Sequence, residues 1–319
     1  MNDIATIALP FFGLIAIGYA AGRWRKTLAE GLTWLNVFVF YVALPALFFK
    51  LVGETPPAAI NWSFVLITVF GAYCTFAIAF SIAALANRGN VPVSTIQGLV
   101  GSYANTGYMG PGLTIAALGP TAAVPTALIF SFESAMLFAL VPLMMALGGT
   151  DRADLGSVLA RSVRSVLRHP FIIAIAAGFI LAATGLRLPQ PIDAFVTMLG
   201  SAAVPCALFA LGVGLAYRRP KTMSADVPAL VAIKLLVHPL IVYMLLGWVG
   251  RFDEVWVYTA VLMAALPPAA NVFVLARQYK VYVDEASAAV LIGTAASVFT
   301  VTGVLWLILS GRLPIDPFH

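Results

Sequence analysis

The chain has 319 residues, of which 61% are apolar and only 10% are charged, and its mean hydropathy is +0.98. Soluble domains carry about 25% charged residues, so this composition excludes a soluble globular protein. The formal net charge of +5 comes from short basic loops and gives no reason to expect a nucleic-acid partner. We therefore predict an all-α polytopic protein in a lipid bilayer.

Ten apolar segments are long enough to cross a membrane as helices, which takes about 20 residues each. They cover residues 4–21, 33–51, 62–86, 93–118, 122–147, 170–186, 192–216, 228–248, 255–275 and 286–309. The first is read as a retained helix rather than a signal peptide, because its basic residues follow the apolar run.

The loops between these segments predict the orientation. One side carries Arg23, Arg25, Lys26, Arg88, Arg152, Arg161, Arg164, Arg168, Arg218, Arg219, Lys221, Arg277 and Lys280; the other carries only Lys50, Arg187, Arg251 and Arg312. The cation-rich side is expected in the cytoplasm. Both termini should then face outside.

An internal repeat divides the chain into two similar halves. A shift of about 160 residues lays Gly18 on Gly178, Pro45 on Pro205 and Phe49 on Phe209. We predict a first repeat over residues 1–147, a cytoplasmic connector with an amphipathic helix over 148–169, and a second repeat over 170–319. Each repeat has five spans, an odd number, so the second must have inverted topology.

Two predicted spans, 93–118 and 255–275, contain residues that break helices. Interrupted helices occur inside a bilayer where the backbone is buried in protein or lines a wet cavity, and a corresponding pair marks a transporter's binding site. The predicted substrate contacts around the breaks are Ser102, Asn105, Thr106, Gly107, Tyr108, Pro267, Pro268 and Asn271. Broken helices also present N–H groups to an anion. A purely structural alternative is that Asn105 and Asn271 only cap the broken ends.

Three ionisable residues lie inside predicted spans. Glu133 either carries a proton or makes a buried structural contact, because a charge at this depth is costly unless it is paired or wet. Lys234 and His238 are one helical turn apart. Lys234 either faces the interior as a countercharge or snorkels to the surface, and His238 either titrates or packs through a hydrogen bond.

The sequence contains no phosphate-binding glycine loop, no metal-spaced histidine or cysteine set, and no nucleophile with a plausible base. We expect no enzymatic activity, no metal and no cofactor apart from a coupling ion, H⁺ or Na⁺.

Three motifs resemble the auxin efflux carrier family: residues 39–49 (VFYVALPALFF), 105–110 (NTGYMG) and 265–279 (ALPPAANVFVLARQY). The resemblance covers essentially the whole chain. The second half is more similar to bacterial members, and residues 130–133 (FSFE) are similar to bacterial carriers of malonate. The long cytoplasmic loop of many plant relatives is missing, which argues against auxin as the substrate.

The resemblance implies ten helices in two inverted repeats, similar to bile-acid symporters and sodium/proton antiporters. Spans 1, 2, 6 and 7 would form a scaffold that makes a homodimer, and spans 3–5 and 8–10 a transport domain in which spans 4 and 9 cross. It implies transport of organic anions by an elevator-like or rocking motion, and the bacterial resemblance implies a bacterial inner membrane. Our hypothesis is a small carboxylate such as malonate as the substrate. Two rivals are a cation/proton antiporter, which typically needs buried aspartates that this crossing lacks, and an uncoupled channel or receptor.

Overall fold

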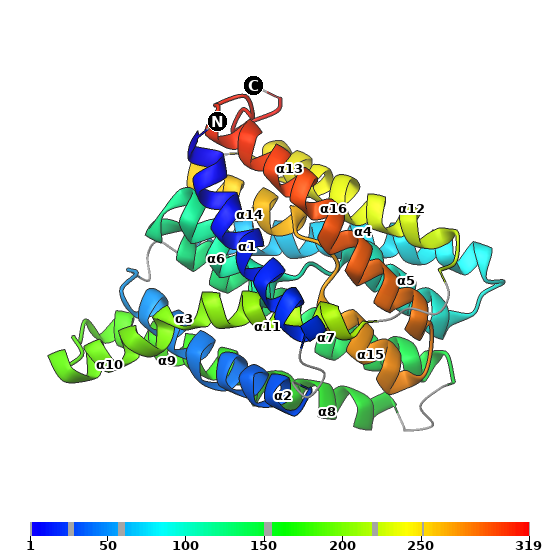
Figure 1. The fold of residues 1–319 in the computed structure, drawn as a ribbon, viewed down its shortest axis with the longest axis horizontal. Coiled ribbons are helices and arrows are strands. Elements are labelled where there is room, and N and C mark those ends of the chain that lie inside the picture. The colour runs from blue at the N-terminus through cyan, green and yellow to red at the C-terminus, as the bar shows by residue number, and fades with distance from the viewer. Residues whose placement is uncertain are drawn as a thin grey trace.

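The computed structural model describes residues 2–24, 29–56, 61–149, 155–218, 223–250 and 252–318. Within these ranges the chain is helical and forms no strand. The two ends of the chain lie close together at the top of Figure 1. The all-α prediction is confirmed for the described residues.

The helices follow one another with short connections. In chain order they are α1 (Asn2–Trp24), α2 (Ala29–Phe38), η2 (Val39–Ala43), α3 (Leu44–Gly53), α4 (Trp62–Ala86), α5 (Val91–Ser102), α6 (Thr106–Leu118), η4 (Pro120–Ala122), α7 (Ala123–Leu147), α8 (Leu155–Leu167), α9 (Pro170–Thr184), α10 (Gln190–Ser201), α11 (Ala203–Tyr217), α12 (Asp226–Ala232), η5 (Ile233–Val237), α13 (His238–Val249), α14 (Glu254–Ala265), α15 (Ala270–Tyr279) and α16 (Val283–Leu309).

Seven stretches of the described chain are long and apolar enough to cross a membrane. They are Ala5–Trp24, Glu30–Gly53, Trp62–Ala86, Pro120–Leu147, Gln190–Tyr217, Asp226–Val249 and Val283–Leu309. The other three predicted spans correspond to α9, which has 15 residues, and to two helices that are interrupted midway, α5–α6 and α14–α15. The protein is therefore a multi-pass membrane protein.

Both interruptions fall where the sequence predicts them. Leu266 precedes Pro267 and adopts an extended conformation, with φ −62° and ψ 149°. A proline disfavours the helical conformation of the residue before it and cannot donate a backbone hydrogen bond, so α14 has to end at Ala265. In the first interruption the chain is extended at Tyr103, with φ −79° and ψ 111°.

Helices from the two halves of the chain pack in close pairs, α1 along α11 and α3 along α9. A Cβ atom added at Gly18 would lie 2.2 Å from the carbonyl oxygen of Phe209, and one added at Gly178 would lie 2.8 Å from that of Phe49. The backbones therefore touch at these glycines. Such contacts are typical of membrane helices, which pack through small residues.

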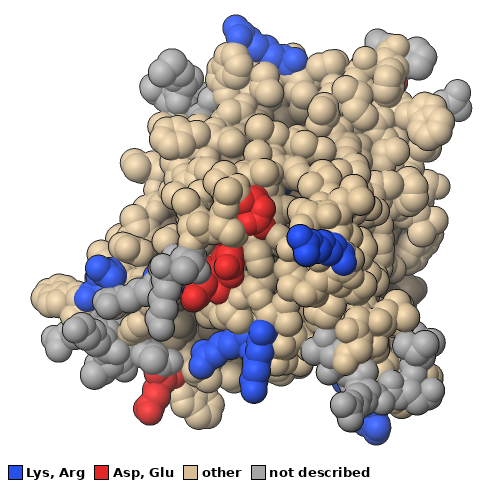
Figure 2. All heavy atoms as spheres, turned by 90° about the vertical axis from the view of Figure 1, so that its right-hand side faces the viewer, with Lys and Arg blue, Asp and Glu red and all other residues tan. Residues whose placement is uncertain are grey.

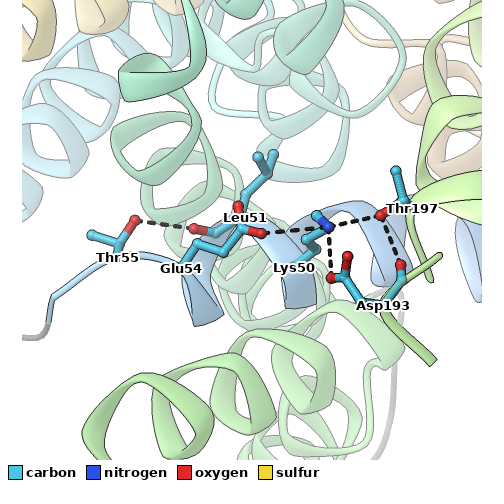
Figure 3. A network of polar contacts seen from close by, with 6 residues as sticks. All are labelled: Lys50, Leu51, Glu54, Thr55, Asp193 and Thr197. Atoms are coloured by element: carbon cyan, nitrogen blue, oxygen red, sulfur yellow. Dashed lines mark hydrogen bonds and ion pairs between the residues drawn. The ribbon is translucent and has the colours of Figure 1, made fainter. Parts of the chain in front are cut away.

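A polar network joins α3 to α10 at the end of the molecule away from α8 (Figures 1 and 3). The ammonium of Lys50 donates to the carboxylate of Asp193 at 2.6 Å and to the hydroxyl of Thr197 at 2.7 Å. It also lies 3.4 Å from the carboxylate of Glu54. The network links two helices that are distant in sequence.

Prolines also shape the uninterrupted spans. A π turn, η2, precedes Pro45, another, η5, precedes Pro239, and α10 gives way to α11 at Ala202, just before Pro205. A proline removes one helical hydrogen bond. In a π turn the bonds run from residue i to i+5, so the turn holds one residue more than an α-helical turn. The chain is thus distorted by a π turn near Pro45 and by a helix break near Pro205.

The predicted amphipathic helix of the connector is α8, which packs against α7 and α9. Its apolar residues Val163 and Leu167 are exposed, as expected of a helix that lies at a membrane surface. Residues 150–154 of the connector lie outside the described residues, as do the predicted loop cations Arg25, Lys26, Arg152, Arg219, Lys221 and Arg251.

Candidate functional site

The two helix breaks lie against each other inside the protein. The N–H of Asn105 donates to the carbonyl of Pro267 at 2.9 Å, and the N–H of Ala269 donates to the carbonyl of Tyr103 at 3.1 Å. Ala104 and Pro268 thereby form a short antiparallel bridge. The bridge ties α5–α6 and α14–α15 together where they cross.

Because of this pairing, fewer backbone N–H and carbonyl groups at the breaks are available to bind a solute. We expected the unpaired backbone at the breaks to form the binding surface, but four of its polar groups bond to one another. An unsatisfied backbone group in a membrane interior costs several kcal/mol, so mutual pairing is favourable. In the first turns of α6 and α15, the N–H groups of Thr106 and Val272 also have acceptors, the carbonyls of Ala104 and Ala269.

A cavity of about 530 Å³ lies beside the crossing. Residues of α2 and α11 form one wall, and residues of α6, α15 and α16 form the other. Its polar lining consists of Asn36, Tyr108, Tyr217, Arg218, Asn271, Arg277, Asp284 and Ser287. Figure 2 shows the face on the right of Figure 1, on which acidic and basic side chains lie near one another across the middle and lower parts.

Two of the predicted substrate contacts, Tyr108 and Asn271, line this cavity. The hydroxyl of Tyr108 donates to the side-chain carbonyl of Asn36 at 3.0 Å, and its ring meets that of Phe40 edge-on, 4.8 Å between centroids. These contacts connect α6 to α2 and its continuation η2. Asn271 is half-buried in the first turn of α15.

The other predicted contacts lie deeper in the protein. Asn105 and Thr106 are buried, and the Nδ2 of Asn105 and the hydroxyl of Thr106 have no hydrogen-bond partner in the described structure. Ser102 bonds within its own helix, to the carbonyl of Gly98. A Cβ at Gly107 would crowd Phe130 and Phe40, at 3.1 and 3.2 Å.

Pro267 and Pro268 belong to the backbone bridge itself. Pro268 also packs closely on α16, where a Cβ added at Gly293 would lie 2.5 Å from its ring. Capping does not explain either asparagine. Asn105 precedes α6 but makes no side-chain cap bond, and the residue at the cap position of α15 is Ala269 rather than Asn271.

Glu133, Lys234 and His238 form a second polar cluster, which does not line the cavity. All three are buried. The ammonium of Lys234 donates to the carbonyl of Ala264 at 2.6 Å, next to the end of α14. Lys234 therefore faces the protein interior and does not snorkel to the surface.

Charge interactions connect this cluster. Lys234 interacts electrostatically with both Glu133 and His238. One carboxylate oxygen of Glu133 and both ring nitrogens of His238 have no hydrogen-bond partner among the described residues. A hydrogen bond that would explain His238 as a packing residue is thus absent from the described structure.

Arg218 and Asn36 were not predicted as site residues. The sequence gives Arg218 as one of many loop cations, yet its side chain turns into the cavity from the end of α11. Its Nη2 lies 3.4 Å from the carbonyl of Ala270, and its guanidinium lies over the ring of Phe273, 4.5 Å from the centroid. Asn36 lies in the largely apolar α2. Its amide among apolar residues is the one feature of the sequence that could have identified it as a site residue.

Known proteins resemble the chain along its whole length. It is 46% identical over 319 residues, covering 100% of both chains, to a protein of Rhizobium meliloti (strain 1021) named "Putative malonate transporter". It is 25% identical over 320 residues to "Uncharacterized transporter YfdV" of Escherichia coli (strain K12), covering 95% and 96% of the two chains. It is 24% identical over 337 residues to "Lysosomal cholesterol signaling protein" of Mus musculus, covering 97% of this chain and 38% of the mouse protein.

A family model described as a membrane transport protein matches residues 4–305, the region that contains the crossing, the cavity and the buried cluster. Nothing in this family assignment indicates an enzyme. The chain therefore belongs to the membrane transport protein family, the auxin efflux carrier family that its motifs resemble, and it is a transporter.

Proposed function

We propose that the protein is a secondary transporter of small organic anions, carboxylates such as malonate. The observation that carries the proposal is the cavity beside two crossing, interrupted helices, with Tyr108 and Asn271 in its lining. The name of the Rhizobium relative supports a carboxylate, and the two arginines of the lining, against one aspartate, favour an anion.

The proposed architecture has ten crossings in two inverted repeats. The seven long apolar segments, α9 and the two interrupted helices together supply ten. The glycine contacts support the repeat: Gly18 touches Phe209, while Gly178 touches Phe49. These are the pairs that the shift of about 160 residues relates, so one contact occurs twice with the halves exchanged.

The proposed mechanism is an elevator, in which the crossing helices move with their neighbours against the scaffold. A network around Asp226 supports a rigid moving body, because the amide of Gln97 and the hydroxyl of Tyr282 both donate to its carboxylate. Asn87 extends the network by donating to Gln97 at 2.7 Å. The network joins the end of α4 to α5, α12 and α16, all within the proposed transport domain.

The scaffold would consist of spans 1, 2, 6 and 7 and would form a homodimer in the bacterial inner membrane. The paired packing of α1 on α11 and α3 on α9 supports this grouping. The cavity has one wall from each proposed domain, so it lies at their boundary. The cation-rich loops support an orientation with both termini outside.

Coupling to H⁺ or Na⁺ would involve the buried cluster. Glu133 has an unpartnered carboxylate oxygen and lies near the ammonium of Lys234. A carboxylate that alternates between charged and neutral forms would serve a proton-linked cycle. Carbonyl and hydroxyl oxygens at the crossing would instead serve Na⁺.

Uptake of labelled malonate into vesicles reconstituted with the purified protein tests the proposal. We expect saturable uptake and counterflow, driven by an imposed H⁺ or Na⁺ gradient, and a loss of at least about tenfold in Asn271→Ala. The matched control is Gln278→Ala, an exposed amide on the same helix, which should retain uptake. Flux without saturation or counterflow would indicate a channel, and normal uptake by Asn271→Ala would place the site elsewhere.

A further inference from the structure

Arg218, at the end of α11, lines the cavity. Its charged group contacts the opposite wall through a bond to the carbonyl of Ala270. The residue caps α11 in an extended conformation, with φ −75° and ψ 122°. This conformation directs its side chain from one wall to α15 in the other, where it reaches Ala270 and Phe273. The guanidinium therefore spans the cavity.

The hydrogen-bonding capacity of this guanidinium is only partly used. Its bond to the carbonyl of Ala270 is long, at 3.4 Å, and its Nη1 is buried with no partner in the described part of the chain. A guanidinium has five N–H donors arranged to meet a planar oxyanion with two parallel bonds. The N–H donors on Nη1 of Arg218 are therefore available to a ligand in the cavity that this side chain lines.

No carboxylate among the described residues forms an ion pair with Arg218. The ion pairs among the described residues are made by Lys50, not by Arg218. Burial lowers the pKa of Arg218 to about 10, so the side chain still carries its charge at neutral pH. A buried charge is normally paired or hydrogen-bonded, and Arg218 has only the long bond to Ala270 and the contact with the ring of Phe273.

A simpler interpretation treats Arg218 as one more cytoplasmic anchor. An anchoring arginine extends its charged end toward water or lipid headgroups, whereas Arg218 turns inward and lies over the ring of Phe273 at 4.5 Å. The stacking fixes the plane of the guanidinium while leaving its edge available. The orientation is that of a receptor for a ligand in the cavity.

We infer that Arg218 binds a carboxylate group of the transported anion through two parallel hydrogen bonds, replacing its long bond to the carbonyl of Ala270. The inference rests on the proposed function and adds the residue that recognises the substrate's charge. Because Arg218 belongs to α11 and Ala270 to α15, a bound carboxylate would also loosen one contact between the cavity's two walls.

The test measures binding of a short dicarboxylate and of its mono-amide to the purified full-length protein in a neutral detergent. In the wild type, we expect the dicarboxylate to bind more tightly than the mono-amide. Charged hydrogen bonds contribute about 1.5–3 kcal/mol, so Arg218→Gln should weaken dicarboxylate binding roughly 10- to 150-fold. The preference for the dicarboxylate should disappear in this variant.

The matched control is Arg88→Gln, which removes an exposed cation that does not line the cavity and should leave both affinities unchanged. If Arg218→Gln does not fold, Arg218→Met provides the same comparison, since its unbranched side chain can still cover Phe273. Arg218→Lys keeps the charge but not the planar fork and should bind with intermediate affinity.

The outcomes separate the inference from the proposed function. A wild type that binds no carboxylate would refute the proposed function. A wild type that binds the dicarboxylate while Arg218→Gln or Arg218→Met keeps the same affinity and preference would overturn the inference alone. An effect of the substitution seen only when phosphatidylglycerol is added would assign Arg218 to a lipid phosphate and would also overturn it.

Discussion

The contact between α1 and α11 allows a prediction whose size follows from the structure. A Cβ atom at Gly212 would lie 2.1 Å from the carbonyl oxygen of Ile15 and 2.8 Å from the backbone nitrogen of Tyr19. Ordinary contact begins at 3.4 Å, so Gly212→Ala would force the helices apart by about 1.3 Å locally. Both obstructing atoms belong to a helix backbone and cannot rotate away.

The expected loss of stability combines two opposing effects. Overpacking of a tight contact costs about 1–3 kcal/mol, and a rigid backbone contact belongs at the upper end. Replacing a helical glycine by alanine gains about 1 kcal/mol from helix propensity. We therefore expect Gly212→Ala to destabilise the protein by about 2 kcal/mol. Gly13→Ala, in the same α1 with no atom within 4 Å of its added Cβ, should be neutral or stabilising by up to about 1 kcal/mol.

Thermal unfolding in detergent, monitored by size-exclusion chromatography of the heated samples, measures the difference in Tm between the two variants. The two variants should differ by about 2–3 kcal/mol, so at about 2–4 °C per kcal/mol the Tm of Gly212→Ala should lie roughly 4–12 °C below that of Gly13→Ala. Adding Gly18→Ala to Gly212→Ala should lower the Tm by less than the two single effects together, because both act on one interface. Equal Tm values for Gly212→Ala and Gly13→Ala would refute the close packing of α1 on α11.

Two further substitutions test the cavity and the buried cluster. Tyr108→Phe removes the 3.0 Å bond to Asn36, worth about 1 kcal/mol, and should change the KM for uptake about fivefold with little change in Tm; an unchanged KM would show that the bond is absent in the transport cycle. Lys234→Met leaves the carbonyl of Ala264 and the Glu133 carboxylate without the ammonium, so it should destabilise the protein by about 3–5 kcal/mol. Lys234→Met with Glu133→Gln should recover part of that stability, and additive losses in Tm would contradict an interaction between the two side chains.

The helix breaks could be predicted from the sequence because local chemistry determines them. Pro267 and Pro268 cannot continue α14, and the glycines around Gly107 weaken the first helix. Their mutual pairing could not be predicted, because the carbonyl of Pro267 and the N–H of Asn105 meet only after helices distant in sequence have packed. Hydrophobic patterns carry no information about such a contact.

The positions of Arg218 and Lys234 show the same limit. Arg218 follows an apolar span and fits the pattern of a cytoplasmic loop cation, and only the backbone conformation at the end of α11 turns it inward. Lys234 lies in the π turn η5, where an extra residue rotates the following helix by about 100°. Helical spacing left open whether Lys234 faces the interior or the surface, and the packing of η5 against α14, where Lys234 donates to the carbonyl of Ala264, decides it.

The strengths of the contacts around the cavity indicate where the structure would open. The backbone bridge between the breaks is buried, and separating it would expose four polar groups to a medium of low dielectric constant. By contrast, two single side-chain bonds join the cavity walls in the described part of the chain, Tyr108 to Asn36 and Arg218 to Ala270. A net worth of about 1 kcal/mol each makes them far easier to exchange for bonds to a solute. The crossing should therefore move as one body, and access should alternate at the boundary that α2 and α11 share with α6 and α15.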